Sequence, residues 1–178
     1  MKKIIVFVLA GVLAGCATAK VENLSNTSYK SPVIQAQQKV FVALPQDGTY
    51  ENKKYEYSGK QVQQNFFDEI SRYANEAVLA DRVLSAQQAR QVAWNQRAEV
   101  FVYPIITSWE DRNTAYSTMR DKIKINVSVY ETRTGALLDR TSLYATGGSI
   151  QWFGWGNPSP SRLLNKVIRP YVKKLYHK

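Results

Sequence analysis

Residues 39–45 read Lys-Val-Phe-Val-Ala-Leu-Pro, and the turn pair Asp47-Gly48 follows one residue later. A short apolar run that stops at a proline and a turn is typical of a strand buried on both faces. Ser58 and Gln61 have the spacing of a capping box, and apolar residues recur at helical spacing from Val62 to Tyr73. The sequence therefore predicts a buried strand followed by an amphipathic helix.

The same succession of elements continues along the chain. Residues 77–80 form a second short apolar run, and Ser85 with Gln88 predicts the start of a helix that extends through Ala93. Residues 100–109 predict a third strand, in which Pro104 indicates a sheet edge or a bulge.

Residues 122–130 alternate strictly between polar and apolar side chains, the pattern of an antiparallel strand with one exposed face. The apolar face consists of Ile123, Ile125, Val127 and Val129. A turn at 132–135 ends in glycine, and residues 136–146 return as the partner strand. A last amphipathic helix begins between Ser159 and Ser161, and Pro170 predicts a kink in it.

These elements have the order β-α-β-α-β-β-β-α, which predicts an α+β fold with one mixed sheet covered by helices. A single domain over residues 39–178 suits the length of the chain, because one core commonly takes roughly 100 to 200 residues. The order resembles the domain shared by the amino-terminal part of TolB, the LpoB-type activators of peptidoglycan synthases and the CsgG-type secretion lipoproteins.

The N-terminus has the three parts of an export signal: Lys2 and Lys3, an apolar run from Ile4 to Leu13, and small residues before Cys16. The apolar run is too short to stay as a membrane-spanning helix, which needs about 20 residues. Residues 1–15 are therefore expected to be removed as a signal peptide.

Leu13-Ala14-Gly15-Cys16 resembles the bacterial lipobox. The resemblance implies cleavage before Cys16, a diacylglyceryl group on its sulfur, and a fatty acid such as palmitate on its new amine. Ala17 in place of aspartate implies the outer membrane rather than the inner membrane, with the domain in the periplasm. The lipobox, the strand at 39–45 and Tyr57-Ser58-Gly59 together resemble an uncharacterised family of proteobacterial lipoproteins with a domain of unknown function.

Residues 16–38 are rich in polar side chains and lack a sustained period, so we expect a lipidated cysteine followed by a flexible tether. Loss of Lys2 and Lys3 leaves 22 basic against 14 acidic residues, a formal charge of +8. Asp139 is the last acidic residue of the chain. The side chains of the last helix at Lys166, Lys173 and Lys174 either form an ordinary solvated face or bind an anionic partner.

The chemistry of that partner follows from the charge. Anionic lipid headgroups, cell-wall carboxylates and an acidic envelope protein all fit a basic surface. Nucleic acid is not expected outside the cytoplasm. The segment 150–158 adds Trp152, Phe153 and Trp155 between glycines and prolines. These aromatics either fold back to cap an open sheet edge or fill the core beneath the last helix, anchor a partner, or contact a membrane interface.

Catalytic groups are scarce. His177 is the single histidine and Cys16 the single cysteine, which excludes histidine-based triads, zinc sites and Cys–His pairs. The neighbours Asp68-Glu69 and Glu110-Asp111 point apart on a helix or strand, and all four carboxylates are expected to be solvated. We therefore expect no enzymatic activity, no cofactor and no metal.

The sequence thus predicts a membrane-anchored periplasmic lipoprotein that acts as a binding or adaptor module, with the aromatic loop and the last helix as its contact surface. The alternative is a subunit of an oligomeric envelope or secretion assembly.

Overall fold

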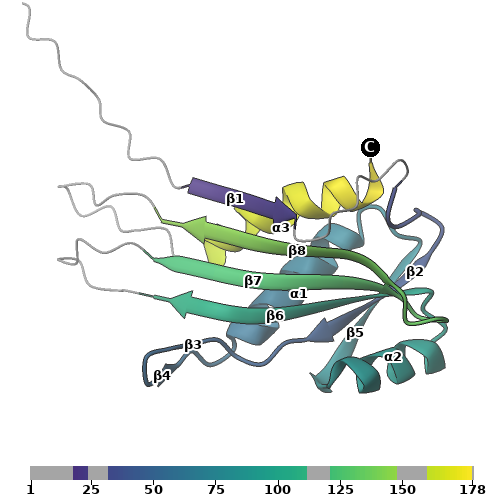
Figure 1. Ribbon diagram of the computed structural model, residues 1–178, viewed down its shortest axis with the longest axis horizontal. Helices are drawn as coiled ribbons and strands as arrows, with labels where there is room; N and C mark the ends of the chain where they lie inside the picture. The colour runs from purple at the N-terminus through teal and green to yellow at the C-terminus, as the bar shows by residue number, and fades with distance from the viewer. Residues whose placement is uncertain (1–17, 24–31, 112–120, 148–159, 178) are drawn as a thin grey trace, which may run out of the picture.

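The computed structural model describes residues 18–23, 32–111, 121–147 and 160–177 (Figure 1). The elements are β1 (Thr18–Asn23), β2 (Lys39–Leu44), β3 (Thr49–Tyr50), β4 (Lys53–Lys54), α1 (Ser58–Ile70), β5 (Glu76–Val83), α2 (Ala86–Asn95), β6 (Val100–Glu110), β7 (Lys122–Glu131), β8 (Leu137–Thr146) and α3 (Pro160–Tyr176). From β2 onward, and apart from the small β3–β4 hairpin, this is the predicted order.

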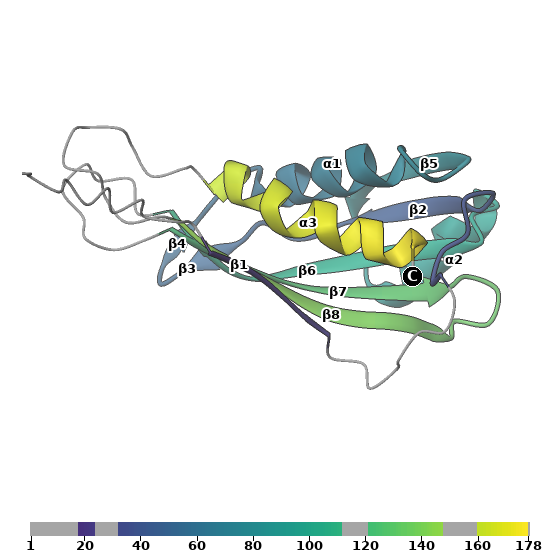
Figure 2. The same ribbon diagram turned by 90° about the horizontal axis from the view of Figure 1, so that it is seen from above.

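The main sheet has six strands in the order β1-β8-β7-β6-β2-β5. β2 is parallel to both of its neighbours, β5 and β6, whereas β6, β7, β8 and β1 are successively antiparallel. The sheet is therefore mixed, and the α+β class is confirmed. Helices α1 and α3 cover one face and α2 lies against the other (Figure 2).

The larger core lies between the sheet and the pair of helices α1 and α3. The four predicted apolar side chains of β7 are all completely buried in it: Ile123, Ile125, Val127 and Val129. Phe66 of α1 meets Tyr171 of α3 edge to face, with ring centroids 6.3 Å apart. The two helices thus pack on each other as well as on the sheet.

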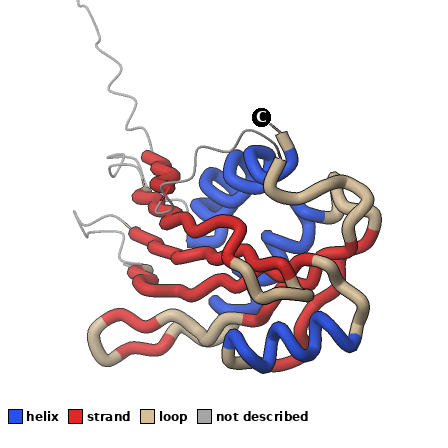
Figure 3. Tube along the Cα trace, turned by 45° about the vertical axis from the view of Figure 1, so that its right-hand side comes forward, coloured by secondary structure: helices blue, strands red, loops and turns tan. Residues whose placement is uncertain are grey.

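The smaller core lies under α2, apart from the other two helices (Figure 3). Its buried residues are Phe41, Ala43, Ala80, Leu84, Ala89, Ala93, Ala98 and Phe101. The predicted capping box is confirmed. The hydroxyl of Ser85 accepts from the backbone N–H of Gln88, and the side-chain oxygen of Gln88 accepts from the backbone N–H of Ser85. α2 packs on β6, and no described helix covers β7, β8 and β1 on this face.

The start of α1 differs from the prediction. Tyr57 is the N-cap residue, with a left-handed φ of 67°, and its own side chain makes no cap. The carboxylate of Asp47 accepts from the first-turn N–H of Gly59 at 2.9 Å. The hydroxyl of Ser58 instead donates to the carbonyl of Tyr55 at 2.6 Å and accepts from the N–H of Gly48 at 2.8 Å. The serine therefore ties the start of the helix to the loop that follows β2.

Two parts of the predicted tether over residues 16–38 lie on the domain instead. Thr18–Asn23 forms β1, which pairs antiparallel with β8 at an edge of the sheet. Farther along, Ile34 is completely buried, and the N–H groups of Val33 and Ile34 donate to the carbonyl of Leu175 at 2.8 and 3.0 Å. The chain thus joins the sheet two residues after Cys16.

The two prolines inside elements have different settings. Pro104 lies in β6 beyond Val102, the last residue that pairs with β2, and a register shift follows between Ile106 and Ser108. This agrees with the predicted edge or bulge. α3 continues through Pro170 to Tyr176.

Candidate functional site

Helix α3 separates apolar from basic side chains. Its buried residues are Leu163, Leu164, Val167, Ile168, Tyr171, Val172, Leu175 and Tyr176. Its exposed cations, which we call the basic face, are Arg162, Lys166, Arg169, Lys173 and Lys174. The first four recur every three or four residues, so they form one stripe along the helix, roughly 17 Å long from Arg162 to Lys173.

The basic face has no compensating acid nearby in sequence, because no Asp or Glu follows Asp139. Within the described residues, none of its five side chains takes part in an ion pair. Lys173 and Lys174 lie in the last turn, where the negative end of the helix dipole favours cations. The arrangement can hold anionic groups by electrostatic attraction, which reaches about 8 Å at physiological salt.

The C-terminal end of α3 is fixed by aromatic contacts. The ring of Tyr73 stacks on Tyr176 with centroids 5.1 Å apart and meets His177 edge to face at 5.4 Å. Burial raises the pKa of Tyr176 above its ordinary value of 10.0, and its buried hydroxyl has no hydrogen-bond partner among the described residues. The end of the helix that carries Lys173 and Lys174 is therefore held in place.

The structure places three of the predicted site residues, and it brings Lys166, Lys173 and Lys174 together on the basic face. The other predicted site residues lie outside the described residues: Leu13, Ala14, Gly15, Cys16, Trp152, Phe153 and Trp155. Their described neighbours in the chain are Thr18, Gly147 and Pro160.

The expectation that all four adjacent carboxylates are solvated is wrong for two of them. Glu69 is 5% exposed and lies 3.3 Å from the guanidinium of Arg72, and Glu110 is 9% exposed. Asp68, by contrast, is exposed and accepts from the side-chain amide of Gln64 at 2.8 Å. In the described ranges, no group of three or more His, Cys, Asp or Glu side chains is arranged to hold a metal ion.

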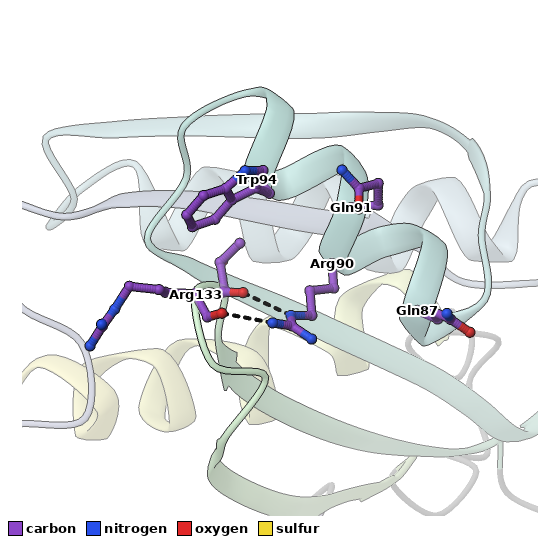
Figure 4. A pocket seen from close by; sticks show the side chains of 6 residues that line it. Gln87, Arg90, Gln91, Trp94 and Arg133 are labelled. Carbon is purple, nitrogen blue, oxygen red and sulfur yellow. Dashed lines mark hydrogen bonds between the residues drawn. The ribbon is translucent and has the colours of Figure 1, made fainter.

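Sequence patterns did not indicate a hollow of about 370 Å³ between α2 and the β7–β8 turn. Arg90 donates from Nε to the carbonyl of Thr132 at 2.9 Å and from Nη2 to that of Arg133 at 2.7 Å (Figure 4). Trp94 lines the same hollow and is 55% exposed. Its neighbours Val92 and Ala93 lie on the side of α2 that packs on the sheet. The apolar pattern of the sequence therefore did not show that Trp94 is exposed.

A second unpredicted hollow, of about 650 Å³, lies where β2 ends and α1 begins. It exposes Tyr57, and it contains the ion pair between Lys54 and Asp47 at 3.6 Å together with Lys60. Its charges are of both signs, so it lacks the one-signed character of the basic face.

Comparison with known proteins gives a family and a shared fold. The family model described as a domain of unknown function, DUF4823, matches residues 33–175. A search of the curated proteins finds no significant match. The PelC dodecamer from Paraburkholderia phytofirmans is similar to this chain with a TM-score of 0.64 at 12% identity, over 92% of this chain and 99% of that chain.

A second solved structure, the lipoprotein GNA1162 from Neisseria meningitidis, has a TM-score of 0.52 at 12% identity, over 78% of this chain and 97% of that chain. At 12% sequence identity, both comparisons show a shared fold and nothing more. In the part of this chain that the structure describes, no helix has the length and apolar character needed to cross a membrane. Because the family model spans nearly the whole folded domain, the chain belongs to the DUF4823 family, a family defined by a domain of unknown function.

Proposed function

We propose that this protein is a lipid-anchored binding or adaptor module of the bacterial cell envelope, and that its basic face holds an anionic partner. The observation that carries the proposal is the stripe of exposed cations on α3, none of which has an ion-pair partner among the described residues. The partner is an acidic envelope protein or the carboxylates of the cell wall. The protein acts by binding and needs no catalytic group, cofactor or metal.

The anchor of this module is the lipid on Cys16. Leu13-Ala14-Gly15 precedes the cysteine as a lipobox does, and Ala17 favours the outer membrane. The likeness of fold to a Neisseria lipoprotein supports the proposal. Buried acyl chains contribute about 0.8 kcal/mol per methylene, so several chains hold the protein at the membrane while the domain faces the periplasm.

The basic face is well suited to steering a partner. Its cations are carried by a helix that packs on both α1 and the sheet, so their spacing is fixed before binding. Attraction between exposed charges speeds association and weakens as salt rises, because the screening length falls to about 3 Å at 1 M. Salt-sensitive binding is therefore the signature of this function.

The test is photo-cross-linking in living cells. A photoreactive residue at Asn165, which is exposed on α3 beside the stripe, leaves all five cations in place. We expect it to capture an anionic envelope component, and the adduct to disappear when Lys166→Glu and Lys173→Glu are added. The matched control reverses two exposed cations elsewhere, Lys60→Glu and Arg82→Glu, and keeps the adduct.

The same experiment decides against the proposal on either of two results. The first is no adduct from Asn165, and the second is an adduct that survives reversal of the basic face. A photoreactive residue at Gln64, exposed on α1, reports capture that does not depend on the basic face.

A second candidate function is a subunit of an oligomeric envelope assembly. It is favoured by the shared fold with the PelC dodecamer, which covers nearly all of both chains. Among the described strands, β1 and β5 are the edges of the main sheet, and edge strands offer backbone groups to a neighbour. The mass of the detergent-solubilised protein tests this function, because a monomer contradicts it and a defined ring supports it.

A further inference from the structure

The first strand of the sheet begins almost at the proposed anchor. Thr18 starts β1, two residues after Cys16, and β1 pairs with β8 from Thr18↔Thr146 to Asn23↔Thr141. Two extended residues reach roughly 7 Å. A lipid on Cys16 therefore keeps this end of the sheet close to the bilayer.

A row of three exposed side chains crosses the sheet near this end. Lys20 of β1 pairs with Tyr144 of β8, which pairs in turn with Lys124 of β7. Directly paired residues point to the same face, and neighbours in sequence point to the opposite one. Leu143 and Ala145 beside Tyr144 are buried in the core under α3, so the row lies on the face that α3 does not cover.

The three side chains of the row are exposed and no helix among the described residues lies over them, whereas Ser142 and Thr146, which flank Tyr144 on this face, are buried. α2 packs over β6 rather than over β7, β8 and β1. Tyr144 is 36% exposed, and the side chain of Lys20 is 69% exposed. Lys124 is also exposed and has no ion-pair partner among the described residues, whereas Lys20 lies 3.7 Å from Glu22 on the same strand.

The chemistry of the row suits a phospholipid surface. A tyrosine has an apolar ring and a polar hydroxyl, and such side chains gather at the level of membrane headgroups. Each lysine near an anionic leaflet strengthens the attraction by roughly fivefold. Lys20 lies four residues from Cys16, roughly 13 Å along an extended strand, so headgroups are within reach of the row.

We infer that Lys20, Tyr144 and Lys124 form a second contact with the membrane, in which this row, at the Cys16 end of the sheet, rests on anionic phospholipid headgroups. This inference rests on the proposed lipidation of Cys16. It fixes the orientation of the domain: the row faces the bilayer, while the β7–β8 turn at the other end of the strands is directed away from it. The basic face of α3, on the opposite face of the sheet, then remains free for a periplasmic partner.

The test uses the full lipidated protein in vesicles. Cys16 is the single cysteine, so acylation leaves an introduced cysteine as the one free thiol for a fluorescent label. The variants are Tyr144→Cys, Glu22→Cys and Leu137→Cys. Glu22 lies on β1 beside the row, and its variant keeps Tyr144 intact, whereas Leu137 is a similarly exposed residue at the far end of β8.

Lipids with a quencher near the headgroup report contact with the label. In vesicles of phosphatidylethanolamine with phosphatidylglycerol, we expect strong quenching at positions 144 and 22 and almost none at 137. Adding Lys20→Glu and Lys124→Glu to the Tyr144→Cys variant should remove most of the quenching. Replacing phosphatidylglycerol by phosphatidylcholine should also reduce the quenching.

Equal quenching at all three positions, or none at 144 and 22, overturns the inference. Intact mass of the same samples separates this failure from failure of the proposed function. Acyl chains on Cys16 with unquenched labels leave the anchor standing and reject the second contact. A mass without acyl chains rejects both.

Discussion

The hydroxyl of Tyr171 donates a hydrogen bond of 2.6 Å to Oδ2 of Asp139, which joins α3 to β8 inside the core. The same carboxylate oxygen accepts from the hydroxyl of Thr141 at 2.9 Å. Tyr171 is 1% and Asp139 2% exposed, so water does not compete for this contact. The bond fixes the rotation of α3 about its axis and therefore keeps the basic face directed toward solvent.

Replacing Tyr171 by phenylalanine should lower the free energy of unfolding by about 2 kcal/mol, because a buried carboxylate oxygen loses a donor while the ring is kept. Urea unfolding followed by circular dichroism measures the change. A decrease below about 0.5 kcal/mol, the usual effect of a surface substitution, contradicts the role given to this bond.

Tyr176 lies five residues later on the same helix and should respond in the opposite way. Its buried hydroxyl has no partner, so Tyr176→Phe should leave the protein as stable as the natural chain or more stable by roughly 1 kcal/mol. The two tyrosine variants are controls for each other, since both remove one oxygen from the buried side of α3. Equal losses in both variants reject this interpretation of the hydroxyl groups.

The raised pKa of Tyr176 also predicts alkaline sensitivity. In the unfolded chain this phenol ionises near pH 10, whereas in the folded chain burial keeps it protonated to higher pH. The folded state then binds more protons, so stability falls as pH rises above 10. Tyr103 has a pKa raised by burial and by Tyr130, so Tyr176→Phe should reduce this fall without abolishing it. Unfolding curves of the natural chain and of Tyr176→Phe at pH 8 and pH 11 test this prediction. The same loss of stability in both proteins contradicts it.

Arg90 should be a structural clamp for α2. Arg90→Lys keeps the charge but cannot donate to both carbonyls in the same fork geometry, and should cost about 1 to 2 kcal/mol of unfolding free energy. Arg140→Ala is the matched control, because Arg140 is exposed on β8 and its side chain makes no hydrogen bond or ion pair within the described residues. A control that loses as much as Arg90→Lys shows that the clamp is not specific.

Elements with many like-directed apolar residues could be predicted from the sequence. In β7 four apolar residues alternate with polar ones, and in α3 apolar residues recur on one side of the helix. In both elements these apolar side chains are buried in the structure. The capping box at Ser85 was also correct, whereas the same spelling at Ser58 was not. The difference is tertiary, because Gly48 in the loop after β2 and Tyr55 just after β4 compete as partners for the hydroxyl of Ser58.

Short segments and surface features were harder to predict. β1 contributes one partly buried apolar residue to the core, Val21, so its polar composition resembles a tether although its backbone pairs with β8. Glu69 is buried because of the way α1 packs on the rest of the domain, and the sequence around Glu69 does not reveal this packing. The cations of α3 were predicted because the lack of acids after Asp139 is visible in the sequence. The row of Lys20, Tyr144 and Lys124 was not, since three separate strands bring it together.

The most direct measurement is the intact mass of the protein extracted from the membrane fraction of its own cells, compared with the Cys16→Ser variant. The account predicts a natural protein that starts at Cys16 and carries acyl chains, and a variant that keeps residues 1–15 and gains no lipid. A natural protein that is uncleaved before Cys16, or that carries no acyl chain there, contradicts the account.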